Sequence, residues 1–177
     1  MPQRVASRRV ILWTMKALTV LILGAALAAF TSSVHADATV TITGVHNCCK
    51  GCAKGIEGAI TKAGATAVID DTTVTITAKS EEEAKKAAGA LVAAGYFGEG
   101  ATAPAITDAK VKTATVGGVH LCCGKCVTAV EKAVKTVTGA TSHNATKGAD
   151  NFTVEGDFST KELATALNKA GFSGSIQ

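Results

Sequence analysis

The six cysteines of this 177-residue sequence carry its clearest chemical signal. They form two Cys-Cys-x-x-Cys clusters, and none lies elsewhere in the chain; the clusters consist of Cys48, Cys49 and Cys52, and of Cys122, Cys123 and Cys126. A histidine, His46 or His120, stands two residues before each cluster. Thiolates are soft ligands that select Cu(I), Zn(II) and related metals. The pattern therefore predicts metal-binding sites rather than cysteines that fill a core.

The spacing within each cluster indicates how the thiols are activated. Cys-x-x-Cys at the start of a helix puts two sulfurs on one side of the first turn. There the free backbone N–H groups and the positive end of the helix stabilise thiolate. Lys50 and Lys125 lie inside the motifs, and we expect them to lower the thiol pKa further. Gly51 and Gly124 allow the loop to bend around an ion.

The two clusters belong to an internal repeat. Gly44 to Cys52 matches Gly118 to Cys126 at an offset of 74 residues, and Ala94 to Gly98 matches Ala170 to Gly174 at an offset of 76. A Ser-x-x-Glu capping box, which opens helices, lies between these landmarks in both copies. Two copies are too few for a solenoid, so the repeat predicts two tandem domains. We expect them at residues 37–102 and 110–177, joined by a linker at 103–109.

Each copy predicts the element order βαββαβ of ferredoxin-like α+β folds. Strands are indicated by alternation of apolar and polar residues, and a helix follows each cysteine cluster. Gly95 and Gly171 are expected to end the second helix of each copy in the left-handed conformation. The other expected elements are strands at 38–43, 66–69 and 73–77 with a helix at 81–93, strands at 110–116, 139–143 and 151–155 with a helix at 160–169, and last strands from Tyr96 and from Phe172.

Both copies resemble the heavy-metal-associated (HMA) domain, a small ferredoxin-like module of copper chaperones, metal-transport ATPases and periplasmic mercury-binding proteins. The resemblance covers nearly all of residues 38–177. It rests on the Cys-x-x-Cys, the following helix and an Ala-Gly-aromatic segment, seen in the second copy as Cys123 to Val134 and Ala170 to Phe172. It implies that the aromatic residue lies near the metal loop. It also implies a ligand pair in each copy, Cys49 with Cys52 and Cys123 with Cys126.

The clusters depart from the HMA pattern in ways that change the expected coordination. The family usually has Met two residues before the first ligand cysteine, where this chain has Asn47 and Leu121. The additional cysteines, Cys48 and Cys122, are expected as third ligands, and His46 and His120 as optional fourth ones. Three thiolates with an optional imidazole suit tetrahedral Zn(II) or three-coordinate Cu(I). We therefore expect about one Cu(I), Zn(II) or Hg(II) ion per domain.

Residues 1–36 have the composition of a signal peptide. Arg4, Arg8 and Arg9 precede an apolar run that ends before Val34-His35-Ala36, which predicts cleavage after Ala36 and export to the periplasm or medium. Arg8-Arg9 also resembles part of a twin-arginine motif. The alternative is an uncleaved membrane anchor over residues 11–30, because about 20 apolar residues span a bilayer.

The charge distribution argues against a nucleic-acid partner. Four of the 18 basic residues lie in residues 1–36, which hold no acid, so residues 37–177 carry 14 basic and 14 acidic residues. This part also contains no arginine. Nucleic-acid binding requires clustered Lys and Arg that displace counterions. We expect metal ions, a metal-donor or metal-acceptor protein, and no membrane contact after cleavage.

Two other functions remain compatible with the sequence. Cys-x-x-Cys at a helix N-terminus also serves thiol–disulfide exchange, although Pro104 is the only proline after residue 36 and lies in the linker. An exported protein can instead hold its cysteines in disulfides and act as an HMA-like interaction module. No other pattern of catalytic residues is evident, and the sequence predicts a metal-binding protein that is not an enzyme.

Overall fold

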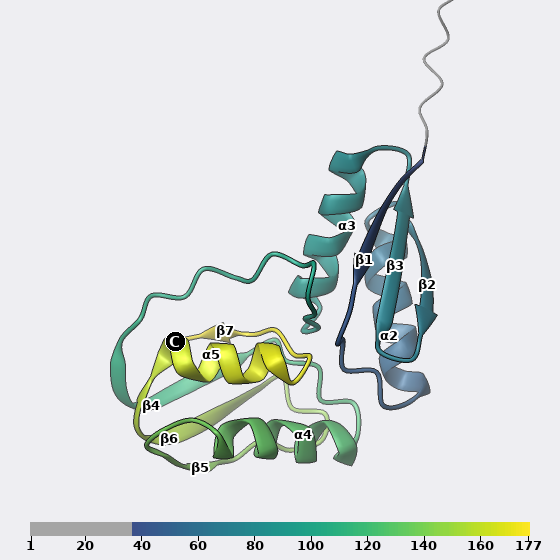
Figure 1. Ribbon diagram of the computed structural model, residues 1–177. Helices are drawn as coiled ribbons and strands as arrows, with labels where there is room; N and C mark the ends of the chain where they lie inside the picture. The colour runs from purple at the N-terminus through teal and green to yellow at the C-terminus, as the bar shows by residue number, and fades with distance from the viewer. Residues whose placement is uncertain (1–36) are drawn as a thin grey trace, which may run out of the picture. The chain divides into compact units, whose positions relative to one another are not determined.

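The computed structural model describes residues 37–177, and the predicted signal peptide at 1–36 lies outside them. Within these residues four α-helices pack against two antiparallel sheets, an α+β fold (Figure 1). Residues 37–177 belong to one compact unit. We refer to residues 37–102 as the first half and to residues 110–177 as the second half. None of the helices in the described part is long and apolar enough to cross a bilayer.

The first half contains a three-stranded sheet in the order β1-β3-β2. Its elements are β1 (Ala38–Ile42), α2 (Lys50–Lys62), β2 (Thr66–Asp70), β3 (Thr73–Ala78) and α3 (Glu81–Ala93). Buried residues alternate along β3, where Val74, Ile76 and Ala78 form the core side of the sheet. α2 contributes Cys52, Ile56 and Ile60 to the same core, so packing of this helix fixes the cysteine motif at its start.

The second half contains a four-stranded sheet in the order β5-β6-β4-β7. Its elements are β4 (Lys110–Gly117), α4 (Gly124–Lys135), β5 (Ala140–His143), β6 (Asn151–Ser159), α5 (Thr160–Lys169) and β7 (Ser175–Ile176). Val130 and Val134 of α4 are buried beneath the sheet with Phe152 and Phe158 of β6. These valines, with Cys126 and Ala133, form the face of α4 that packs.

The capping boxes form as expected at both second helices. Ser80 accepts a hydrogen bond from the backbone N–H of Glu83 at 3.2 Å, and Ser159 accepts one from that of Glu162 at 3.1 Å. The Glu162 carboxylate accepts a hydrogen bond from the backbone N–H of Thr138 at 2.8 Å. The two helices have the predicted bounds, because the cap and the amphipathic spacing agree on where they begin.

The last strand of each half is shorter than predicted. In the first half it is reduced to a bridge between Thr43 and Glu99, and in the second half it begins at Ser175 rather than at Phe172. Tyr96 and Phe172 instead pair with each other across the two halves. The backbone groups expected to extend each sheet are thus used between the halves.

Candidate metal centre

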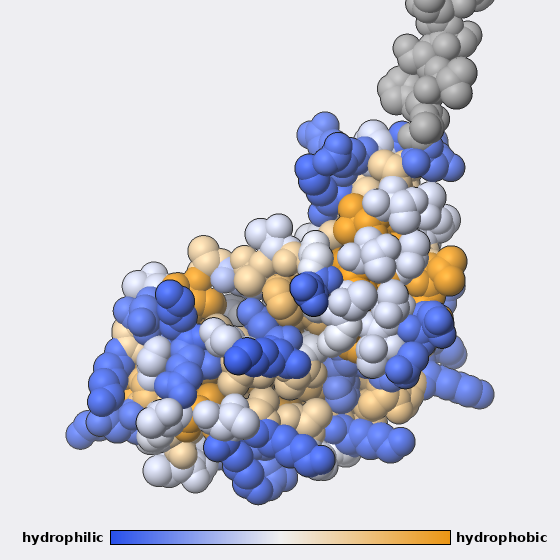
Figure 2. Space-filling view, in the orientation of Figure 1, coloured by the Kyte–Doolittle hydropathy of each residue, from blue (hydrophilic) through white to orange (hydrophobic). Residues whose placement is uncertain are grey.

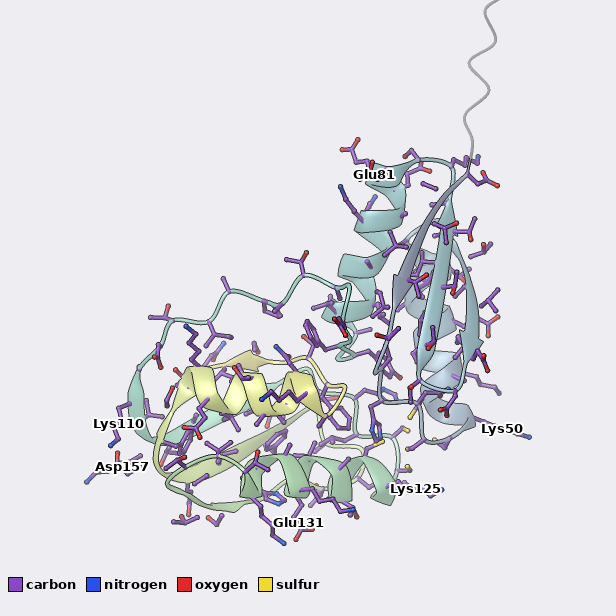
Figure 3. All side chains as sticks on the ribbon, in the orientation of Figure 1. Lys50, Glu81, Lys110, Lys125, Glu131 and Asp157 are labelled. Atoms are coloured by element: carbon purple, nitrogen blue, oxygen red, sulfur yellow. The ribbon has the colours of Figure 1, made fainter. Side chains whose placement is uncertain are left out.

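The cysteines occupy the loops that lead into α2 and α4. Cys49 and Cys123 are the N-cap residues of these helices, and Cys52 and Cys126 lie in the first turns with no exposed surface. Figure 3 shows the sulfur atoms gathered at the N-terminal ends of the two helices. All six cysteines are free thiols.

The sulfur atoms of the two halves lie together rather than in two separate groups. The Sγ atom of Cys122 is 3.4 Å from those of Cys49 and Cys52, and Cys48 Sγ is 3.5 Å from Cys123 Sγ. The closest recorded pairs within one half are 3.7 Å apart. The thiols therefore approach the other half at least as closely as they approach their own, which the sequence did not predict.

Four overlapping groups of ligand atoms could hold a metal ion, and within each group the atoms lie within 4.8 Å of one another. The groups are Cys48, Cys49 and Cys123; Cys49, Cys52 and Cys122; Cys122, Cys123 and Cys126; and Cys48, Cys52 and Cys126 with His46. Three of the four combine thiols from both halves. Each sulfur belongs to two groups, so a thiolate in this arrangement can bridge two ions.

The thiols differ in acidity. Backbone N–H groups at the start of α4, that of Cys126 first, lower the pKa of Cys123 to about 6, and the corresponding N–H groups of α2 lower the pKa of Cys49. Burial is the main cause that raises the pKa of Cys48 and of Cys122. Each half thus offers one readily formed thiolate at a helix end and one thiol that metal binding must deprotonate.

The two lysines of the motifs have a smaller role than predicted. Both Lys50 and Lys125 are exposed, and in Figure 3 their side chains point away from the sulfur atoms. The lowered pKa of Cys49 and Cys123 has the backbone N–H groups as its main cause. An exposed ammonium group is well solvated, which weakens its effect on a nearby thiol.

The two histidines lie beside the sulfur atoms and pack against the aromatic residue of the other half. The ring of His46 stacks on Phe172 at 4.3 Å between centroids, and His120 lies 4.6 Å from Tyr96. Burial lowers the pKa of both histidines, which favours the neutral form that ligates metals. The Nε2 atom of each is buried and has no hydrogen-bond partner among the described residues.

Only one histidine joins a possible metal site in the described part of the chain. His46 has a ring nitrogen within 4.8 Å of Cys48, Cys52 and Cys126, which gives a set of three thiols and one imidazole. His120 belongs to no such group among residues 37–177. Its role as a ligand stays a prediction, and the structure shows it as a packing partner of Tyr96.

Reciprocal backbone hydrogen bonds join the Ala-Gly-aromatic segments of the two halves. The Phe97 N–H donates to Gly171 O at 3.0 Å, and the Ser173 N–H donates to Gly95 O at 3.0 Å. Both glycines have positive φ, as predicted for helix ends. A Cβ atom on Gly171 would lie 2.3 Å from the backbone nitrogen of His46, and one on Gly95 would lie 2.6 Å from that of His120. Glycine is thus required at these positions by contact between the halves as well as by backbone conformation.

Tyr96 and Phe172 link the two halves, which the sequence did not predict. The HMA resemblance places each aromatic residue near a metal loop, but the structure puts each ring against the histidine of the other half. The Tyr96 hydroxyl also donates to Cys52 O at 3.1 Å within its own half. The paired Ala-Gly-aromatic segments are the sequence signal, although a repeat alone does not show that its copies touch.

Comparison with known proteins identifies a solved structure but no family. No protein-family model and no curated protein matches the chain. Among solved structures, the N-terminal soluble domains of Bacillus subtilis CopA match at 17% identity, with 81% of this chain and 95% of that chain covered and a TM-score of 0.31. The fold assignment rests on the element order and sheet topology of this chain. The metal site likewise rests on its own side chains.

Proposed function

We propose that this protein binds soft metal ions through the thiolates of its two Cys-Cys-x-x-Cys motifs and buffers them or transfers them outside the cytoplasm. The observation that carries the proposal is the convergence of six free thiols and the His46 ring in overlapping groups of ligand atoms within 4.8 Å. Soft donors at this density favour Cu(I), Zn(II) or Hg(II) over hard cations, which prefer oxygen ligands.

The mixed burial of the thiols supports exchange of metal as well as storage. Cys52 and Cys126 are fully buried, whereas Cys49 and Cys123 are partly exposed at the helix ends and have the lower pKa values. A thiolate of a partner protein can therefore attack at the exposed side and replace one bound sulfur at a time. Figure 2 shows only small, separate hydrophobic patches on the face in view, which fits brief contacts with a partner better than a permanent interface there.

The direct test is a free-thiol count on the reduced, anaerobically purified chain before and after addition of Cu(I), Zn(II) or Hg(II). We expect six reactive thiols without metal and strong protection with it. The Cys49→Ser and Cys123→Ser double variant should lose tight uptake, with Thr128→Ser on the exposed side of α4 as the control. Complete disulfide pairing under mild reductant with no metal uptake would favour the disulfide-stabilised interaction module. Catalytic turnover in an insulin-reduction assay would favour a thiol–disulfide enzyme.

Export is a separate part of the proposal, supported by the basic, apolar and small-residue order of residues 1–36. Fractionation of expressing cells with mass measurement of the exported chain tests it. We expect a mature protein that begins at Asp37. A chain that keeps residues 1–36 and stays with the membrane fraction would instead establish the anchor.

A further inference from the structure

We propose that the six thiolates hold one cluster of four Cu(I) ions that both halves share, with each thiolate bridging two ions. The inference rests on the proposed function and deepens it, because it replaces one ion per half with a single joint site. It follows from the overlap of the ligand groups. Four groups use three thiols each, and each of the six thiols serves in two of them.

The sulfur–sulfur distances favour three-coordinate ions. With a metal–sulfur bond of about 2.3 Å, three sulfurs around one ion lie about 4.0 Å apart and two sulfurs on opposite sides lie about 4.6 Å apart. Cys49 and Cys52 have their sulfurs 3.8 Å apart, and Cys123 and Cys126 have theirs 3.7 Å apart. The neighbouring pairs between the halves span 3.4 to 4.0 Å. These distances suit shared three-coordinate ions better than a linear ion in each motif.

The ligand groups limit how many of the six thiols zinc can use. The group with four ligand atoms, His46 with Cys48, Cys52 and Cys126, suits one tetrahedral Zn(II) ion. Zinc bound there leaves Cys49, Cys122 and Cys123 without metal although they lie against the same site. Cu(I), which accepts three thiolates, can use all four groups at once.

The number of ligand groups favours four ions over two. Binding is written 4 Cu⁺ + 6 RSH → [Cu₄(SR)₆]²⁻ + 6 H⁺, in which copper stays Cu(I) and each thiol releases its proton. Two ions would fill two of the four groups and leave the thiols of the others protonated or bound to one ion only. The N-termini of α2 and α4, each equivalent to about +0.5 charge, meet at the sulfurs and offset part of the −2 of the four-ion cluster.

A shared cluster also accounts for the reciprocal contacts between the halves. The hydrogen bonds of Gly95 and Gly171 and the two histidine–aromatic pairs hold both loops at one place before metal arrives. Each thiol that the first ion deprotonates also belongs to a second ligand group, so the next ion meets thiolates that are already formed. The inference therefore predicts cooperative filling.

Native mass spectrometry of the reduced full chain during anaerobic titration with Cu(I) tests the cluster. We expect the spectrum to be dominated by the copper-free chain and the chain with four ions, and X-ray absorption to show copper–copper scattering. Stepwise binding that ends at two ions overturns the shared cluster and leaves the proposed function standing. Absence of Cu(I), Zn(II) and Hg(II) binding overturns both.

Variants sharpen this test. Cys122→Ser removes a thiolate from two groups and should abolish the four-ion species, with the retained copper falling at least twofold. Ser142→Ala, at an exposed position on β5, is the control and should keep four ions. Retention of four ions by Cys122→Ser would contradict bridging by this thiolate. Circular dichroism confirms that the variant is folded, and the titration of the unchanged chain stays decisive if it is not.

Discussion

The two halves present the same contact to each other with one polar difference. Tyr96 of the first half packs on His120, and Phe172 of the second half packs on His46. The Tyr96 hydroxyl reaches Cys52 O and also lies where a Cβ atom of Gly55 would stand, at 2.3 Å. Ala129 takes the place of Gly55 in the second copy, where the aromatic ring has no hydroxyl. The contact is thus present in both halves with a different pair of residues, Gly55 with Tyr96 and Ala129 with Phe172.

A second difference lies just before the cysteines. Leu121 is buried at 3% exposure, whereas Asn47 is partly exposed and donates from Nδ2 to Asp71 O at 2.8 Å. One loop is held by apolar packing and the other by a hydrogen bond to the β2–β3 turn. Because these interactions differ in strength, the two loops should differ in how firmly they hold their thiols.

The largest expected effect is a difference in folding stability between variants of Leu121 and of Asn47. Leu121→Ala should lower the free energy of unfolding by about 2–5 kcal/mol, since it empties a buried site. Asn47→Ala should cost about 1 kcal/mol, the net value of one hydrogen bond. Chemical denaturation of both variants without metal measures this. Equal losses would show that the two loops are anchored equally.

The next expected effect tests the contact between the halves. Gly171→Ala should lower the folding stability by about 1–3 kcal/mol from backbone strain alone. The added methyl group would also clash with the backbone nitrogen of His46. We expect cooperative copper uptake to be lost with it. Gly89→Ala is the control, because it lies in α3 with nothing within 4 Å of its Cβ position and should stabilise the chain by about 0.5–1 kcal/mol. Unchanged uptake by Gly171→Ala would separate the metal site from this contact.

A smaller effect tests the paired change at Gly55 and Tyr96. Gly55→Ala should destabilise the fold by about 1–3 kcal/mol through overpacking against the hydroxyl. Addition of Tyr96→Phe should recover much of that loss, because it recreates the pairing of the second half. Gly58→Ala, one turn further along α2 with open space around it, is the matched control. If the double variant is as unstable as Gly55→Ala alone, the hydroxyl is not the cause.

The smallest effect concerns the ionisation and reactivity of the thiols at the helix ends. Because Cys123 has a pKa near 6 and that of Cys48 is raised, iodoacetamide at pH 7 should modify Cys123 well before Cys48. Folding lowers the Cys123 pKa, so the Cys123 thiolate stabilises the fold at high pH. This contribution to stability is lost as the pH falls through about 6. Peptide mapping at several pH values measures both rates. In denaturant we expect Cys123 and Cys48 to be modified at equal rates. Equal rates in the folded chain would contradict the difference in their pKa values.

Much of the fold could be predicted from the sequence. The bounds of α3 and α5 follow from their capping boxes, and the positive φ of Gly95 and Gly171 follows from their places at helix ends. The last strands were overestimated, because the N–H of Phe97 bonds to Gly171 rather than within its own sheet. Local pattern identifies a strand-forming segment but does not reveal a competing partner from the other copy.

The candidate site was predicted in its residues but not in its arrangement. The soft chemistry of Cys49, Cys52 and their counterparts is evident from their spacing, because neighbours in sequence at a helix start are neighbours in space. The approach of Cys122 to Cys49 depends on contacts between distant segments, and a repeat offset contains no information on those. The buried, unpaired Nε2 atoms of the two histidines likewise become evident only in the structure.

The central claim is that thiols of the two halves meet, and controlled oxidation of the reduced, metal-free chain tests it most directly. Brief treatment with iodine joins adjacent thiols, with two electrons and two protons lost per disulfide. Trypsin then cuts after Lys50 and Lys125, which separates Cys52 and Cys126 from the other two cysteines of their motifs. The account predicts that the peptide with Cys48 and Cys49 is linked by disulfide to the peptide with Cys122 and Cys123, and that this link disappears in denaturant. Disulfides confined to Cys49–Cys52 and Cys123–Cys126 would contradict it.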